Sequence, residues 1–162
     1  IQPDTTEINR DSIGTLHIVD ELETKNHGIE GLAYDRLRTC FFIVKEKSPQ
    51  ELYQISFPDG LDGNYEISTP WDLEDDLDGM SDLSGIYYDS SSSHLWILSH
   101  ESSCLIEFSL DGTEITNQSF HAGHAGLFRT IHQAEGVTKD TDGNLYICGE
   151  PNFFYVFSER TP

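Results

Sequence analysis

Glu30-Gly31-Leu32-Ala33-Tyr34-Asp35 opens a pattern that occurs three times in this chain. The second copy reads Ser84-Gly85-Ile86-Tyr87-Tyr88-Asp89, and the third reads Glu135-Gly136-Val137-Thr138-Lys139-Asp140. Each copy is followed by an apolar run that ends in an acid, at residues 41–46, 96–101 and 145–150. A repeat of this kind predicts one supersecondary unit that is used three times.

A third apolar element completes each copy, as Leu52-x-x-Ile55-Ser56, Leu105-x-x-Phe108-Ser109 and Phe154-x-x-Phe157-Ser158. The copies recur about every 50 residues, near the period of roughly 40 to 50 residues that is typical of β-propeller blades. We therefore expect an all-β fold, a propeller segment of about three four-stranded blades within a single domain over residues 1–162. The blades are expected near residues 26–70, 80–121 and 131–162, with fourth strands near 65–67 and 114–120 and none after the third copy.

A strand-like run near residues 13–19 precedes the first copy and resembles the last strand of a preceding blade. Propellers typically close with four to eight blades, so three blades and one spare strand do not make the usual ring. Two explanations follow. The chain is part of a longer propeller, which we favour, or two copies form a six-bladed ring in which each spare strand completes the partner's last blade.

The composition limits the class of partner. The chain of 162 residues has 29 acids and 9 bases, for a formal net charge of −20. Nucleic acids and anionic membranes would be repelled, whereas cations would be attracted. Acidic residues in turns, or adaptation to a saline habitat, would explain this charge as well as a functional role would. The chain begins with Ile1, which indicates a processed or excised product, and a membrane contact is expected only through an anchor outside this sequence.

The recurring acids form the candidate site. In a hairpin the start of the first strand lies beside the end of the second, so Glu30 should neighbour Glu46, and Glu135 should neighbour Glu150. Glu101 ends the matching run of the second copy, where Ser84 replaces the first glutamate. First strands line a propeller channel, so these acids should converge on one face. Converging carboxylates need a compensating cation, and calcium, with about six to eight oxygen ligands, suits them best, although another divalent cation is possible.

A purely architectural interpretation stays open. Glutamates at strand ends can accept backbone N–H groups, or can pair with bases such as Lys45, Lys47 and Arg129. The repeat would then preserve contacts that stabilise the blades.

Two segments resemble a known family. Residues 133–137, 142–147 and 149–155 are similar to the C-terminal signature of the SdiA-regulated domain family, and residues 26–35 are similar to its earlier blade motif. The resemblance covers about residues 26–158. It implies an NHL-like β-propeller of the bacterial envelope, periplasmic or extracellular, with no settled activity and with members longer than this chain. Ser84 departs from the Glu-Gly motif that Glu30 and Glu135 match.

A looser similarity links the Glu-Gly motifs to calcium-dependent propeller lactonases and esterase-like phytases. It implies an alternative function, a metal-dependent hydrolase of lactones or phosphoesters. His100, next to Glu101, is the candidate general base, and an exposed histidine without a role is the simpler interpretation. We leave open whether the chain is an enzyme and favour a binding or scaffold module.

Other motifs indicate no further site. His121 and His124 have a spacing that could serve zinc, yet a glycine-rich loop explains them. The acidic segment from Asp72 to Asp82 lacks the order of a calcium-binding EF-hand loop, so we expect a solvated loop. The three cysteines, Cys40, Cys104 and Cys148, contain no C-x-x-C pair and are expected in the core. There is no G-x-S-x-G nucleophile motif and no P-loop.

Overall fold

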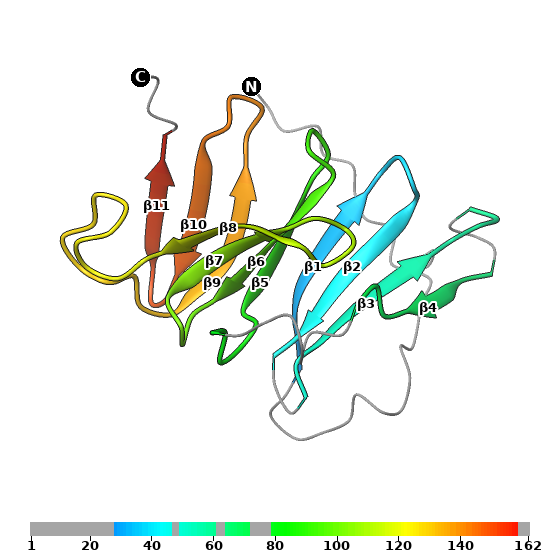
Figure 1. The fold of residues 1–162 in the computed structure, drawn as a ribbon, viewed down its shortest axis with the longest axis horizontal. Helices are drawn as coiled ribbons and strands as arrows, with labels where there is room; N and C mark the ends of the chain where they lie inside the picture. The colour runs from blue at the N-terminus through cyan, green and yellow to red at the C-terminus, as the bar shows by residue number, and fades with distance from the viewer. Residues whose placement is uncertain (1–27, 47–48, 61–63, 72–78, 159–162) are drawn as a thin grey trace.

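The structure is a computed structural model that describes residues 28–46, 49–60, 64–71 and 79–158 (Figure 1). All regular elements within these ranges are β-strands, which form three antiparallel sheets. The first sheet has the order β1(Ile29–Asp35), β2(Cys40–Lys45), β3(Glu51–Ser56), β4(Glu66–Ser68). The second has the order β5(Gly85–Asp89), β6(His94–Ser99), β7(Cys104–Phe108), β8(Glu114–Ser119). The third has the order β9(Ala134–Lys139), β10(Leu145–Gly149), β11(Phe153–Phe157).

The predicted fold class is confirmed, because the three sheets follow the three sequence copies and resemble propeller blades. The expected fourth strands are β4 and β8, and the third sheet has three strands among the described residues. The expected strand near residues 13–19 lies outside the described residues. No helix in the described ranges has the length and apolar character needed to cross a membrane.

The aspartate that ends each first strand fixes the hairpin turn that follows. Asp35 Oδ1 accepts the backbone N–H groups of Leu37 and Arg38 at 2.8 and 3.2 Å. Asp89 Oδ1 accepts the Ser91 N–H at 2.9 Å, and Asp140 Oδ1 accepts two N–H groups at 2.9 Å each. A carboxylate that bonds the backbone two residues further on is typical of turns, which explains why Asp recurs at this position.

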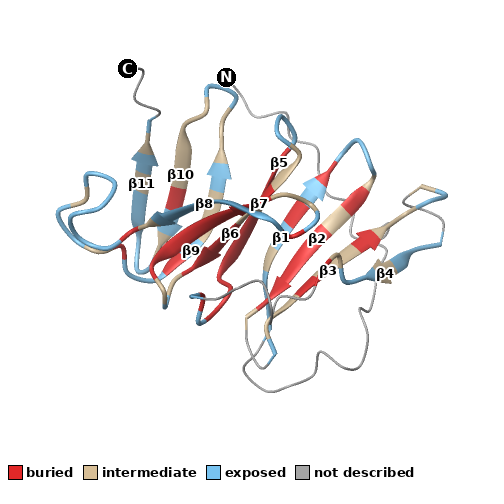
Figure 2. Cartoon of the chain, in the orientation of Figure 1, coloured by how far each residue is buried: buried red, intermediate tan, exposed pale blue. Residues whose placement is uncertain are grey.

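The sheets lie side by side, with β1 next to β5 and β5 next to β9 (Figure 1). Two apolar clusters join them, since alternate residues of each strand face the neighbouring sheet. The cluster between the first and second sheets includes Phe42, Leu52 and Phe108, and the cluster between the second and third includes Leu98 and Ile147. Burial is therefore concentrated in the middle sheet, as Figure 2 shows.

The outer face of the third sheet is open. Cys148 pairs across β10 with Gly136 on β9 and with Phe154 on β11, so the three residues share one face of the sheet. Phe154 and Val156 on this face are 67% and 54% exposed. Cys40 and Cys104 are buried as expected, but the expectation for Cys148 was wrong, because no described element covers its side of the sheet.

Candidate functional site

A β-bulge lies at the start of two of the three first strands. The register between β1 and β2 shifts between Ile29 and Gly31, which leaves Glu30 as the extra residue. The same shift between β9 and β10 leaves Glu135 as the extra residue between Ala134 and Gly136. A bulge re-aims the side chain of its extra residue, so the Glu-Gly motif directs a carboxylate away from the ladder at the same end of both sheets.

The glycine of each motif lets neighbouring first strands approach closely. A Cβ atom on Gly31 would lie 2.9 Å from the backbone nitrogen of Ile86 and 2.8 Å from Val44 Cγ2. On Gly85, it would lie 3.3 Å from the carbonyl oxygen of Glu135. The repeated glycine therefore places the starts of β1, β5 and β9 close together, along with the residues that precede them.

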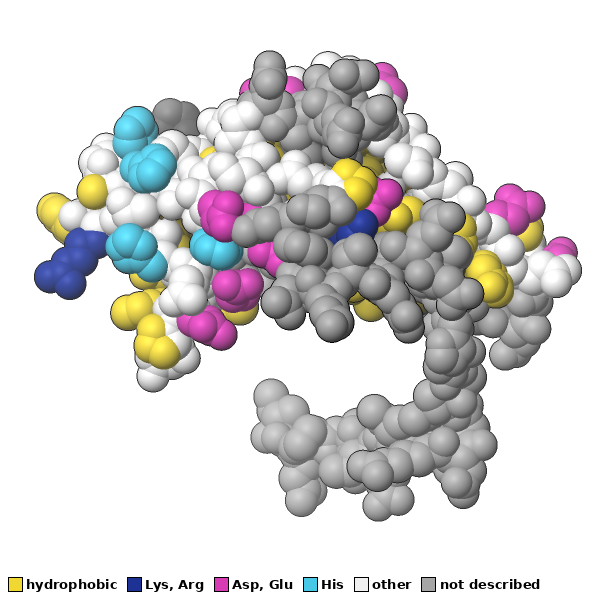
Figure 3. Space-filling view, turned by 90° about the horizontal axis from the view of Figure 1, so that it is seen from below, with side chains coloured by type: hydrophobic (Ala, Val, Ile, Leu, Met, Phe, Trp, Pro, Cys, Tyr) yellow, Lys and Arg dark blue, Asp and Glu magenta, His cyan; other side chains and the backbone are white. Residues whose placement is uncertain are grey.

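Side chains from all three sheets meet in a small pocket at this end of the strands, with a volume of about 90 Å³. Acidic side chains gather around a histidine on this face of the molecule (Figure 3). The pocket is lined by Glu30, Glu46, Asp82, Ser84, His100 and Glu135.

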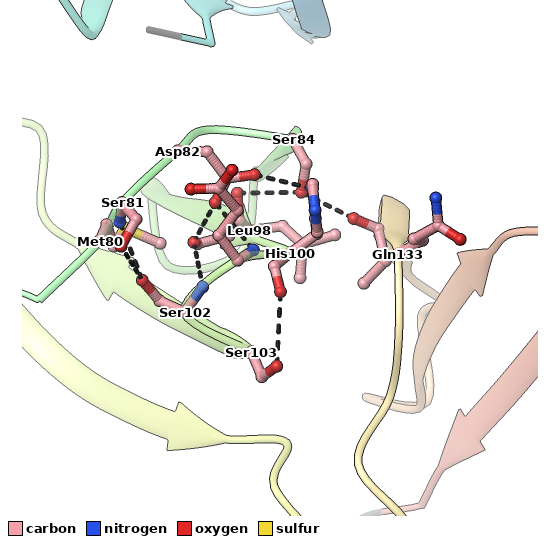
Figure 4. Close-up of polar contacts among 12 residues, drawn as sticks. Met80, Ser81, Asp82, Ser84, Leu98, His100, Ser102, Ser103 and Gln133 are labelled. Carbon is pink, nitrogen blue, oxygen red and sulfur yellow. Dashed lines mark hydrogen bonds and ion pairs between the residues drawn. The ribbon is translucent and has the colours of Figure 1, made fainter.

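Asp82 is the buried member of this group, with 0% exposure, so the expectation that it lies in a solvated loop was wrong. Its Oδ1 atom accepts hydrogen bonds from the Ser99 hydroxyl and, at 3.0 Å, from the Glu101 N–H. Its Oδ2 atom is buried, lies 2.9 Å from His100 Nδ1 and has no aligned hydrogen bond among the described residues. These contacts fix the position of the Asp82 carboxylate, which lines the pocket, and Figure 4 shows the polar contacts around it. The other acids of that segment, Asp72, Glu74, Asp75, Asp76 and Asp78, lie outside the described residues.

Ser84 joins the second and third sheets. Its hydroxyl donates to the carbonyl oxygen of Ala134 at 2.7 Å, and its N–H donates to the Leu98 carbonyl at 2.8 Å. The second copy therefore gives the pocket a hydroxyl group in place of a glutamate. Asp82, two residues upstream, provides the carboxylate of this sheet.

Glu101 and Glu150, the other two predicted metal ligands, are not among the residues that line the pocket. Glu101 is exposed and does not line it, although its backbone N–H binds Asp82. Glu150 accepts a hydrogen bond from Gln133 Nε2 at 3.4 Å, and its backbone N–H donates to the Gln133 carbonyl at 2.9 Å. It lies close enough to Glu135 to influence that residue's pKa.

The pocket disfavours the charged form of Glu135. Partial desolvation raises the pKa of Glu135, and the charges of Glu150, Glu30 and Asp82 act in the same direction against the lowering effect of His100. Like charges at close range raise the pKa of one another. A bound cation would remove this repulsion.

The remaining expected residues lie elsewhere or bind other groups. Lys45, considered as a partner of the strand-end acids, is buried, and its Nζ atom donates to Glu51 Oε2 at 2.7 Å. His121 and His124 are exposed in the loop after β8. Among the described residues, no three His, Cys, Asp or Glu side chains are grouped so that they could hold a metal ion as they stand.

The sequence profile of the SdiA-regulated family matches residues 1–158. The chain belongs to this family. Solved structures resemble this SdiA-regulated chain in fold. A gluconolactonase from Xanthomonas campestris gives a TM-score of 0.53 at 20% identity, over 79% of this chain and 37% of that one. A chain of a nidogen/laminin complex gives 0.59 at 17% identity, over 83% of this chain and 47% of that one.

Both structures are β-propeller proteins, and the SdiA-regulated chain spans less than half the length of either. The likeness therefore supports the blade architecture of the three sheets.

The donor set of the SdiA-regulated chain is made of hard oxygen atoms. Carboxylates of Glu30, Glu46, Asp82 and Glu135 and the Ser84 hydroxyl fit a calcium-like ion better than a soft metal. The sequence indicated three of these carboxylates through the repeat. It did not indicate Asp82, which stands outside the repeat, and the only available signal was its position two residues before the second copy.

Proposed function

We propose that this chain is a divalent-cation-binding segment of a β-propeller of the cell envelope, with calcium as the preferred ion and a binding or scaffold role. The observation that carries the proposal is the convergence of carboxylates from three sheets around the fully buried Asp82. An anionic pocket of oxygen donors gains most from a hard cation, because the ion relieves the repulsion among its own ligands.

The proposed ligands are Glu30, Glu46, Asp82 and Glu135, and Glu101 and Glu150 contribute negative charge nearby. The carboxylates would have to move to close around an ion, and Glu30 and Glu135 are exposed, which leaves their side chains room to do so. Asp82 stays fixed by Ser99 and by the backbone of Glu101. One fixed carboxylate and several mobile ones suit the flexible geometry of calcium.

The test is the thermal midpoint of the chelated protein with and without millimolar calcium, with magnesium as the comparison. A ligand of the native state raises the midpoint by mass action. We expect a calcium-selective rise that is lost in Glu135→Gln. The control is Glu114→Gln on β8, an exposed glutamate outside the pocket that should keep the full rise. An equal midpoint with and without calcium in the unmodified chain would contradict the proposal.

A second candidate function is a metal-dependent hydrolase of lactones or phosphoesters, which the position of His100 favours. Its Nδ1 atom lies 2.9 Å from the buried Asp82 Oδ2, so the ring is held at the pocket, where it can accept a proton from water. A cation bound in the pocket would polarise the substrate carbonyl or phosphoryl oxygen. The test is proton release from lactones and from nitrophenyl phosphodiesters in the presence of calcium. Turnover that is lost in His100→Gln would support a hydrolase. No turnover by the unmodified chain would contradict the hydrolase and favour the binding or scaffold role.

A further inference from the structure

A second and larger cavity lies between the second and third sheets, with a volume of about 620 Å³. It includes Lys139, the last residue of β9, whereas the carboxylate pocket includes Glu135 near the start of the same strand. Ligand sites for small molecules typically have volumes of about 300 to 1,000 Å³. The cavity is therefore large enough for a small organic ligand and is separate from the proposed cation site.

Its walls combine aromatic surface with neutral polar groups. Trp96 and Phe157 supply the aromatic part, and the fully buried Phe120 stacks against Phe157. Thr116 and Gln118 on β8, together with Ser158, supply neutral polar side chains. Asn117 also lines the cavity, but its side chain lies on the opposite face of β8 from that of Gln118. Amide and hydroxyl side chains both donate and accept hydrogen bonds, so they match a ligand that carries hydroxyl groups.

The charge of the cavity is balanced. Lys139 is the only charged residue among those described that line it, and its Nζ atom donates to Asp89 Oδ2 at 2.8 Å. The same ammonium group lies 4.8 Å from the centre of the Trp96 ring. Because Asp89 neutralises Lys139 and the whole chain carries a formal net charge of −20, the cavity is not suited to anions.

Trp96 offers the cavity its ring surface and not its indole N–H. The Nε1 atom of Trp96 is buried and has no hydrogen-bond acceptor among the residues that the structure describes. This atom has almost no accessible surface although the cavity is empty, so a ligand would contact the partly exposed carbon surface of the Trp96 ring and not its N–H. Lys139 and Asp89 fix the ring next to the cavity.

From these observations we infer that the cavity binds a neutral saccharide. The C–H faces of a sugar ring would pack against Trp96 and Phe157, while its hydroxyl groups reach the Gln118 amide and the Ser158 hydroxyl. The inference does not depend on the proposed cation site, and the experiment is carried out in chelator.

The experiment is a nitrogen-15 NMR titration with maltose, cellobiose and diacetylchitobiose as separate probes. The chain has 2 tryptophans, so its spectrum holds two indole signals, which Trp96→Phe assigns. We expect a saturable shift of the Trp96 signal with at least one disaccharide and none of the Trp71 signal, since Trp71 lies in the cluster between the first and second sheets. Unmoved signals with all three sugars, or equal shifts of both, would overturn the inference.

Gln118→Ala tests the polar wall without touching the core, because Gln118 is exposed on β8. Loss of one hydrogen bond should weaken disaccharide binding about three- to tenfold. The matched control is Gln54→Ala on β3, whose amide donates to Ser56 Oγ far from the cavity and should leave the affinity unchanged. If the Trp96 signal shifted with inorganic phosphate but with none of the sugars, the inference would be wrong, and the cavity would bind an anion near Lys139.

Discussion

At Gly31 the absence of a side chain decides how closely two sheets approach. The backbone nitrogen of Ile86 would lie 2.9 Å from a Cβ atom there, and a strand backbone cannot give way as a flexible side chain can. The glycine is therefore required by the contact between β1 and β5. This contact also brings Glu30 toward the second sheet.

Gly31→Ala should destabilise the fold by about 1 to 3 kcal/mol, the range found when extra groups are forced into a packed contact. Urea unfolding followed by circular dichroism measures it. The matched control is Gly28→Ala, where a Cβ atom would meet only Glu30 Oε1 at 3.6 Å, an ordinary contact distance. Equal stabilities of the two variants would show that the sheets can separate slightly at no cost.

A single residue also joins the second and third sheets at the hairpin end. Burial disfavours the charged form of Asp89, but hydrogen bonds from Lys139 and Ser91 outweigh this and lower its pKa to about 2. The ordinary value is 3.8. Asp89 is buried, with only 7% of the residue exposed, so solvent screens its ion pair with Lys139 little.

Because the folded pKa is lowered, this contribution is present above about pH 4 and is lost as the pH falls toward 2. The shift corresponds to roughly 2 kcal/mol at neutral pH. At pH 7 the Asp89→Asn variant should be less stable than the unmodified chain by about this amount. The difference in their free energies of unfolding should disappear as the pH falls toward 2. Unfolding curves in urea from pH 7 to about pH 2 measure it. Asp142→Asn, in an exposed turn, is the control, and a gap that stays constant with pH would contradict the assignment.

At the scale of the strands, most of the fold follows from the repeat. The apolar alternation places β1 to β3, β5 to β7 and β9 to β11, and the recurring Asp35, Asp89 and Asp140 mark the hairpin turns. Their regularity made the prediction possible, since each level of the pattern indicates the same unit. The β-bulges at Glu30 and Glu135 could not be predicted from the sequence, because they arise from the pairing of two strands.

The site could be predicted only in part for the same reason. Glu30, Glu46 and Glu135 repeat with the strands that position them, so they were indicated by spacing. Asp82 belongs to a segment between sheets, and the packing of that segment onto Ser99 and His100 buries it. Acidic neighbours in the sequence made a solvated loop the natural expectation. Tertiary contacts, which a local pattern does not contain, decided otherwise.

At the scale of the whole molecule, the two outer sheets each have an exposed apolar face. Leu32 and Tyr34 on β1 are 61% and 42% exposed, and Phe154 and Val156 are exposed at the other end of the row. Contiguous exposed apolar patches usually mark interaction sites. In a propeller, such faces contact further blades.

We expect the isolated chain to associate through these faces, and to do so more strongly as salt screens the net charge of −20. Sedimentation velocity in low and high sodium chloride measures it. The Phe154→Ser/Val156→Ser double variant should reduce the association, whereas Phe128→Ser, fully exposed in a loop, should not. A monomer even in high salt, where the net charge is screened, would contradict the expectation that these faces associate.

The bulges at Glu30 and Glu135 also bear on how a chain with three similar hairpins avoids mispairing. A strand that slides by one residue against its neighbour turns its apolar side chains to water. An extra residue at a fixed place allows one alignment of β1 with β2 and one of β9 with β10, because any other alignment would leave the bulge facing a regular ladder. We therefore expect Glu30 and Glu135, which also bring charge to the pocket, to disfavour a shifted register of these two strand pairs.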